Sequence, residues 1–210
     1  MDERPPAALR AGKLQDVISR SVKLESDVVN YRFENDFAGG IKCEVIEFSG
    51  CCFKNCRFTG CSAERDYFTN SEFTNCDFSS TAFSECFFQN CTFTGCKLLG
   101  ASAADCIFEN IFFQGCNCRF MGFSPSKFKK TRFKACALES ASFNGCSFKS
   151  SSFDGCGMEK AEFLHTPLSG MDMRSNEISG IVLSGQELRG AVVSPIQACG
   201  LARYLGVIIK

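Results

Sequence analysis

The stretches CTFTGCKLLG, residues 91–100, and ASFNGCSFKS, residues 141–150, repeat a motif of five residues with an apolar residue at its centre. Counted in steps of five from Val28 to Val193, this central register holds 19 of the 23 Phe. The register two residues earlier holds 12 of the 16 Cys, and the other three registers are mainly polar, charged or Gly. The pattern therefore predicts two inward-facing registers and three that face water.

A period of five matches neither a strand nor a helix, so each repeat must turn a corner. Columns appear at intervals of twenty: positions 33, 53, 73, 93, 113, 133 and 153 are all Phe, and positions 56, 76, 96, 116, 136 and 156 are all Cys. Such columns arise if four repeats close one square coil and equivalent sides stack about 4.8 Å apart. We expect an all-β solenoid of about eight coils over residues 28–193.

These repeats resemble the pentapeptide-repeat family, whose pattern has Leu or Phe at the centre and a small residue two positions earlier. The resemblance covers about four-fifths of the chain and implies a right-handed quadrilateral β-helix. Because the same fold carries unrelated functions, the repeat by itself predicts architecture and leaves the function open.

Both ends of the chain depart from the repeat. Residues 1–27 are expected to form a tail and an N-terminal cap. At the other end, residues 194–210 predict a short helix and tail, with Ser194 as N-cap, Pro195 at the first helical position and Gly206 as the stop. The apolar side chains there predict either a cap on the last coil or a two-fold dimer. The expected dimer residues are Ile196, Ala198, Leu201, Ala202, Tyr204, Leu205, Val207 and Ile208.

The C-terminal segment also resembles that of the Qnr quinolone-resistance proteins, through Gln197-Ala198, Leu201, Leu205-Gly206 and the apolar end. The resemblance implies a homodimer that binds DNA gyrase or topoisomerase IV and protects it from a quinolone or natural poison. Qnr proteins of the plasmid type carry loops that interrupt the coil, whereas this repeat is unbroken. The alternative is a non-catalytic interaction module with an unrelated protein partner.

Three apolar residues occupy an outward register at intervals of twenty: Tyr67, Phe87 and Ile107. They are expected to stack as one stripe, with Phe112 close around the corner and with Arg65 and Asp66 as a polar rim. A contiguous exposed stripe marks a contact surface more often than scattered apolar residues do. The alternative is an ordinary piece of protein surface.

The charges balance, with 23 basic and 23 acidic residues. This neutrality disfavours direct nucleic-acid binding and limits mimicry of duplex DNA to a partial role. Acidic residues outnumber basic ones before residue 124, and basic residues are concentrated shortly afterwards. The basic cluster consists of Lys127, Lys129, Lys130, Arg132 and Lys134. A solvated face is its simplest interpretation, and its role stays open.

No arrangement of residues predicts catalysis, a metal or a cofactor. Sulfur atoms stacked in a line suit neither a disulfide nor a tetrahedral metal site, so the Cys column is interpreted as small buried hydrophobes. His165, the single His, has no recognisable partner and is expected at the surface beside Pro167. With neither a signal peptide nor a long apolar run in the sequence, we expect a soluble cytoplasmic protein with no membrane segment.

Overall fold

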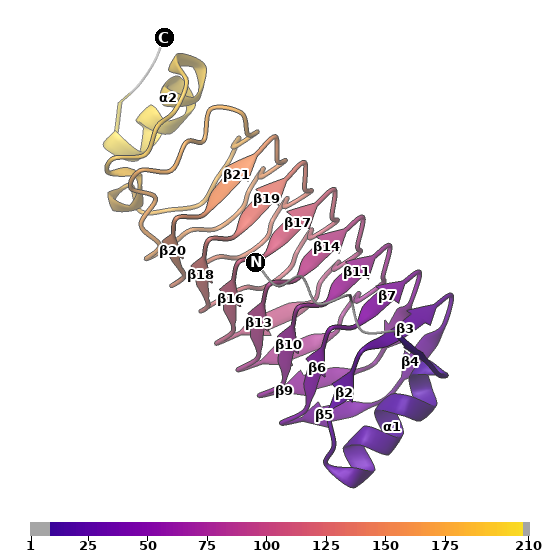
Figure 1. Ribbon diagram of the computed structural model, residues 1–210. Coiled ribbons are helices and arrows are strands. Elements are labelled where there is room, and N and C mark those ends of the chain that lie inside the picture. Colours follow the sequence, from indigo (N-terminus) through magenta and orange to yellow (C-terminus); the bar gives the residue numbers. More distant parts are fainter. Residues whose placement is uncertain (1–8, 208–210) are drawn as a thin grey trace, which may run out of the picture.

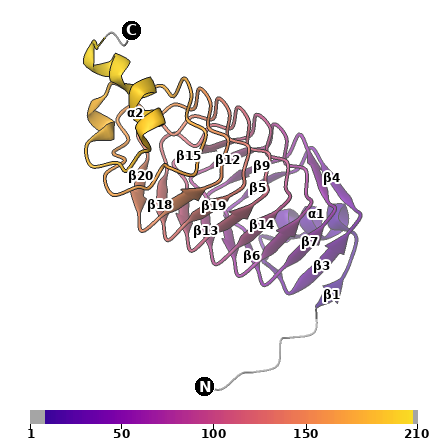
Figure 2. The same ribbon diagram turned by 90° about the horizontal axis from the view of Figure 1, so that it is seen from above.

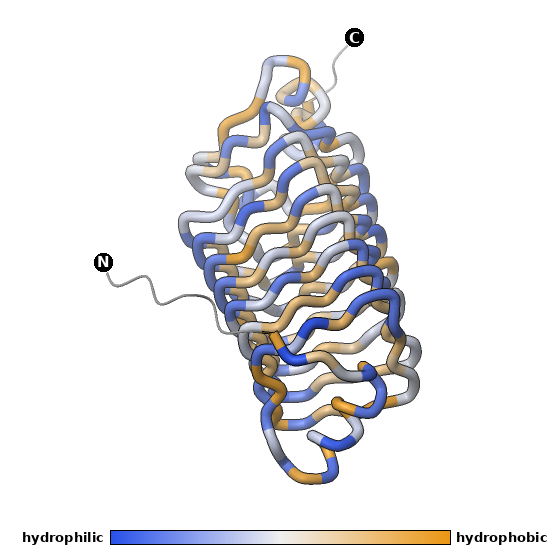
Figure 3. Tube along the Cα trace, turned by 45° about the vertical axis from the view of Figure 1, so that its right-hand side comes forward, coloured by the Kyte–Doolittle hydropathy of each residue, from blue (hydrophilic) through white to orange (hydrophobic). Residues whose placement is uncertain are grey.

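The computed structural model describes residues 9–207, and its chain winds into a four-sided parallel β-helix (Figure 1). Strands twenty residues apart pair in parallel, so that Phe73 lies in register between Phe53 and Phe93. Apolar and polar residues are interspersed along the coils (Figure 3). The predicted solenoid, its register and its stacked Phe columns are confirmed. No helix in the described part of the chain is long and apolar enough to cross a membrane.

Two sides of the coil are continuous sheets of eight and seven strands. The eight-stranded sheet is, in order, β1 (Arg10–Ala11), β3 (Tyr31–Glu34), β7 (Cys52–Lys54), β11 (Glu72–Thr74), β14 (Thr92–Thr94), β17 (Phe112–Gln114), β19 (Arg132–Lys134) and β21 (Ser152–Asp154). The seven-stranded sheet is β2 (Val28–Val29), β6 (Glu47–Ser49), β10 (Tyr67–Thr69), β13 (Phe87–Gln89), β16 (Ile107–Glu109), β18 (Lys127–Lys129) and β20 (Ser147–Lys149).

The other two sides are less regular. One has four strands, β5 (Lys42–Glu44), β9 (Ser62–Glu64), β12 (Ala82–Ser84) and β15 (Ser102–Ala104), and the other has two, β4 (Phe37–Gly39) and β8 (Arg57–Thr59). Both continue towards the C-terminus through single parallel bridges, such as the one between Asp77 and Lys97. The coil therefore keeps its cross-section after its strands have shortened to bridges.

Most corners are made by a residue in the left-handed conformation at every fifth position. Asn55 (φ 52°) and Gly60 (φ 62°) are typical, because Asn and Gly tolerate this region with little strain. Val45 and Phe120 adopt the same conformation with φ 57°. A β-branched or bulky residue is disfavoured there, so these two corners are locally strained.

Ladders of Phe fill the core. Along the eight-stranded sheet the rings of Phe53, Phe73, Phe93 and Phe113 stack with centroids 4.8, 4.6 and 4.9 Å apart. The thiols of the Cys column are buried and unpaired, and each donates to backbone carbonyls, as Cys96 does to the Phe73 carbonyl at 3.3 Å. The predicted burial of this column is confirmed, and hydrogen bonding explains how sulfur is accommodated there.

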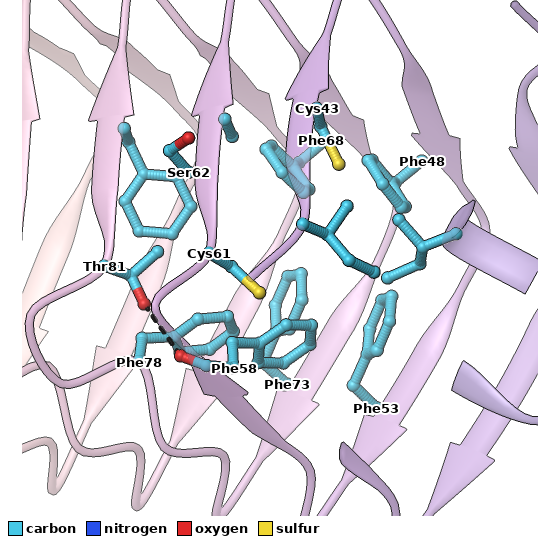
Figure 4. A pocket seen from close by; sticks show the side chains of 14 residues that line it. Cys43, Phe48, Phe53, Phe58, Cys61, Ser62, Phe68, Phe73, Phe78 and Thr81 are labelled. Carbon is cyan, nitrogen blue, oxygen red and sulfur yellow. Dashed lines mark hydrogen bonds between the residues drawn. The ribbon is translucent and has the colours of Figure 1, made fainter. Parts of the chain in front are cut away.

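The core has a small apolar cavity near the N-terminal end, of about 40 Å³ (Figure 4). It exists because Cys43 and Ala63 occupy central positions that are Phe on the neighbouring sides, for example Phe48 and Phe58. Cys61 also lines it, whereas the Thr81 hydroxyl beside it donates to the Phe58 carbonyl at 3.2 Å. A space of this size holds no ligand larger than a few atoms.

Helices close both ends of the coil (Figure 2). The N-terminal helix α1 (Leu14–Leu24) buries Leu14 and Ile18 against β2, β4 and β5. Near the other end are the 3₁₀ turn η1 (Gln186–Leu188), the helix α2 (Pro195–Leu201) and the 3₁₀ turn η2 (Ala202–Leu205). Ser194 caps α2 through a capping box with Gln197, and Gly206 ends the helical segment with φ 71°. The N-cap residue and the stop residue are therefore those predicted from the sequence.

Candidate protein-binding surface

The outer face of the seven-stranded sheet has one apolar column, which we call the stripe: Tyr67, Phe87 and Ile107. Each residue pairs in register with the next across β10, β13 and β16. Tyr67 is 49% exposed and Ile107 38% exposed, whereas Phe87 is half-buried between them. The Tyr67 and Phe87 rings lie 6.1 Å apart. The coil thus brings three residues, distant in sequence, onto one continuous surface.

Phe112 lies on the adjacent side of the coil. It belongs to β17 of the eight-stranded sheet, pairs in register with Thr92 and Arg132, and is half-buried. Phe112 is therefore next to the stripe in sequence but faces outward from a different sheet.

Arg65 lies at the corner that precedes β10, and its side chain is exposed. Its guanidinium forms ion pairs with the carboxylates of Glu44 and Glu64, the latter at 3.2 Å. Both pairs are solvent-exposed and contribute little stability. The Arg65 guanidinium therefore lies beside the stripe together with two carboxylates.

Asp66 is not part of an exposed rim, and this prediction is wrong. The side chain is fully buried because residue 66 falls in the inward register that elsewhere holds Cys. Its Oδ1 accepts a hydrogen bond from the Ile46 backbone N–H at 2.8 Å, whereas Oδ2 has no partner. Burial, followed by the nearby Glu44 and Glu64 carboxylates, raises the pKa of Asp66 to about 7.

Other apolar side chains are exposed that were not singled out from the sequence, and the most exposed of these in the repeat region are Phe37 (55%), Val45 (62%) and Phe120 (64%). Each occupies one of the three outward registers, so listing every apolar residue in those registers would have found them. They lie on other sides or corners of the coil and provide matched controls for the stripe.

Opposite charges bound the stripe at its two ends. Glu47 on β6 pairs with Tyr67, and Lys127 on β18 pairs with Ile107. Lys129 forms an ion pair with Glu109 at 2.5 Å. The other members of the basic cluster, Lys127, Lys130, Arg132 and Lys134, are exposed and form no ion pair within the described part of the chain.

A surface hollow of about 340 Å³ lies where the stripe meets the basic cluster. Ile107 and Lys127 line one side of it, and Asp105, Pro125 and Gly145 line the corner. The hollow therefore adjoins both the apolar stripe and the basic cluster.

The C-terminal segment packs on its own coil. Leu201 is buried, and the Tyr204 hydroxyl donates to the Ile181 carbonyl of the last coils. The expectation that Leu201 is available to a second copy is therefore wrong, whereas Tyr204 is half-buried and its contact with a second copy stays a prediction. Ile196 is 87% exposed, and Ala198 and Val207 are exposed too.

Ala202 is half-buried in this cap. The Leu205 side chain and Ile208, which complete the expected dimer residues, lie outside the described residues.

The remaining candidates for chemistry among the described residues are the thiols and His165. No group of three His, Cys, Asp or Glu side chains there is arranged to hold a metal ion. Burial raises the pKa of Cys91 and of Cys146 to about 11, so these thiols are poor nucleophiles. His165 is exposed at a corner with φ 59°, as expected for a surface residue.

Comparison with known proteins identifies the repeat. Residues 66–141 match the model of the pentapeptide repeat region. No curated protein matches the sequence. The fold is that of a pentapeptide-repeat β-helix, and 33 solved chains resemble it.

Two of the solved structures that resemble this chain are HetL and QnrB1. HetL, a pentapeptide repeat protein involved in heterocyst differentiation regulation from the cyanobacterium Nostoc sp. strain PCC 7120, is 9% identical with a TM-score of 0.51, over 83% of this chain and 92% of that one. Trypsin-treated QnrB1, a plasmid-mediated fluoroquinolone resistance protein, is 17% identical with a TM-score of 0.48. The similarity covers 88% of this chain and 99% of the QnrB1 chain. Likeness at this level of identity shows the fold alone.

Proposed function

We propose that this chain is a non-catalytic scaffold that binds another protein through the stripe. The observation that carries this proposal is the register of Tyr67, Phe87 and Ile107 on adjacent strands, which gathers their apolar area in one contiguous column. Such a contiguous patch gains free energy when a partner covers it. The hollow beside Ile107 adds a recess at one end of that patch.

Site-specific photo-cross-linking tests the scaffold in cells. A photoreactive phenylalanine replaces Phe87 in one variant and Phe120 in a matched control, because both residues are outward-facing Phe on different sides of the coil. We expect a discrete cross-linked protein from position 87 and none from position 120. Equal labelling from both positions, or none from position 87, contradicts the assignment of the stripe.

A type II topoisomerase is the specific partner that we propose, because the C-terminal sequence resembles that of the Qnr proteins. The rod is neutral overall, so binding would depend on local apolar contacts rather than on mimicry of a uniformly charged duplex. Affinity should accordingly fall only modestly as salt concentration rises.

The assay is supercoiling by purified DNA gyrase, or decatenation by topoisomerase IV, in the presence of a quinolone. The wild-type chain should raise the drug concentration needed for half-inhibition. Tyr67→Ser with Phe87→Ser should abolish that effect, whereas Phe37→Ser with Phe120→Ser should retain it. A wild-type chain that gives no protection to either enzyme refutes the topoisomerase proposal.

A further inference from the structure

The stripe belongs to a sheet whose charges run from acidic to basic along the rod. The column that contains it reads Asp27, Glu47, Tyr67, Phe87, Ile107, Lys127, Ser147. Phe87 stands at the centre of this column, and its strand β13 is the fourth of the seven strands in the sheet. The two halves of the column are therefore complementary, with acid and apolar residues on one side and apolar and basic residues on the other.

We propose that this sheet pairs face to face with the same sheet of a second copy, antiparallel, about a two-fold axis at Phe87. The inference rests on the proposed role of the stripe as a contact surface, which a second copy would cover in competition with any other protein partner. A two-fold axis between the faces and parallel to the strands reverses the rod direction, so each column meets itself in reverse order. Phe87 then meets the partner's Phe87, and Tyr67 meets the partner's Ile107.

The charges match in this arrangement. Glu47 faces the partner's Lys127, and the symmetry repeats the pair on the other side of the axis. This supplies a counter-ion for Lys127, which has none within the described part of the chain. Lys127 of one copy therefore lies over the acidic end of the other, where Asp27 is also exposed.

The neighbouring column fits the same axis. Gln89 meets its own copy, Thr69 meets the partner's Glu109, and Ser49 meets the partner's Lys129. Every one of these contacts permits a hydrogen bond across the interface. Among the strands of this sheet and the corner residues that precede them, like charges approach at one place only. This place is the corner before β13, where Glu85 meets its own copy.

The area of the proposed interface limits the affinity of the dimer. Seven strands about 4.8 Å apart, with about three residues across each, give a footprint of roughly 30 by 10 Å per copy. This is below the roughly 800 Å² per partner of a standard interface. The dimer should therefore be weak, should form only at high micromolar concentration or above, and should weaken further with salt.

Sedimentation velocity over a range of protein concentrations measures the association. Glu47→Lys and Lys127→Glu should each weaken the dimer about tenfold, because each places two like-charge pairs across the axis. The combined charge-reversal variant should restore wild-type association. Glu85→Gln should strengthen the dimer, because it removes the repulsion at the axis.

Phe87→Lys should give a monomer, whereas the matched control Phe120→Lys and the tail variant Ile196→Ser should remain dimeric. Circular dichroism and thermal melting establish that each variant is folded. A wild-type chain that is monomeric at high concentration, or a charge-reversal pair that fails to restore association, overturns the proposal. If position 87 still cross-links another protein while the chain is monomeric, the second copy is excluded and the scaffold stands.

Discussion

Asp66 occupies a position in the coil where other side chains bind two backbone groups of the preceding coil. At the same register, Asn176 accepts from the Cys156 backbone N–H at 2.9 Å and donates from Nδ2 to the Phe153 carbonyl at 3.1 Å. Asp66 makes the first kind of bond but its Oδ2 has no partner. A proton on Oδ2 would let it donate as Asn176 does, to the carbonyl 23 residues earlier. The carboxyl is therefore accommodated best in its neutral form.

This predicts stability that falls as pH rises. The folded-state pKa of Asp66 is about 7 against an ordinary 3.8, so the folded chain binds this proton more tightly than the unfolded chain. The contribution is complete below about pH 4 and is lost as pH rises to about 7. At about 1.4 kcal/mol per pKa unit, the loss of stability is on the order of 4 kcal/mol.

Urea unfolding between about pH 5 and pH 8 checks this prediction. Asp66→Asn should be more stable than the wild type at the higher pH, and its stability should lose most of the pH dependence, because the amide reproduces the two bonds of Asn176. Glu44 and Glu64 face the same corner and are paired with Arg65, so Glu64→Gln provides a control for their charge. An identical pH slope in Asp66→Asn and wild type would show that Asp66 is ionised in the folded chain.

The thiols provide a second prediction at this scale. Cys199 is exposed on α2, whereas Cys91 is buried and its pKa is raised to about 11 by burial. We expect N-ethylmaleimide to label Cys199 within minutes and the buried Cys column only on unfolding. Mass spectrometry of the native protein, with Cys199→Ser as the control, measures this directly. Rapid labelling of Cys96 or Cys116 in the folded protein would contradict their burial.

At the scale of the element, the corner is what the sequence predicts least well. A repeat of five implies a turn, but it does not show that the fifth residue must adopt positive φ. Asn and Gly at many corners reflect that requirement, and Val45 departs from it with φ 57°. Val45 is also 62% exposed, so little packing offsets its strain.

Val45→Asn should therefore stabilise the chain by about 1 kcal/mol, because Asn tolerates the left-handed region. The reverse change at an equivalent corner, Asn75→Val, should destabilise by a similar amount, since Asn75 has φ 52°. Urea unfolding at constant pH compares the two. If Val45→Asn is destabilising, the Val45 side chain makes contacts that outweigh its strain.

The stripe and its surroundings show where sequence reasoning succeeds and fails. Tyr67, Phe87 and Ile107 were placed correctly in one column because the period of twenty fixes which side each residue occupies. Sequence reasoning misplaces Asp66, because a charged side chain suggests exposure although its register points inward. Leu201 was assigned to a partner because a helix pattern shows an apolar face without showing what covers it.

At the scale of the whole molecule, each coil contacts only its neighbours, so the rod behaves as a one-dimensional array. The columns of core residues could be predicted directly from the sequence, because a strict period of twenty leaves only one way to stack the Phe residues. The helix α1, at Leu14–Leu24, was not predicted, since it lies outside the repeat and its role depends on the coil end that it covers. The repeat thus makes the structure of the middle of the chain predictable, whereas the structure of the two ends depends on tertiary contacts.

The same array makes deletions informative. Removing residues 131–150 takes out one coil and joins Lys130 to Ser151, so that Phe153 stacks on Phe113 and every column remains in register. We expect a shorter folded rod whose melting temperature changes little, because the lost coil takes with it one set of nearest-neighbour contacts.

Removing only residues 131–135 shifts all later coils by one side. Inward residues still meet inward residues, but Leu138 now lies over Phe113, and Phe143 over Cys118, so one interface packs poorly. Removing the single residue Ser150 instead turns later Phe side chains outward, which should unfold the C-terminal coils. Thermal melting followed by circular dichroism should rank the twenty-residue deletion as the most stable, the five-residue deletion next and the one-residue deletion last. A five-residue deletion as unstable as the one-residue deletion would mean that the matched columns, more than inward register alone, hold the coils together.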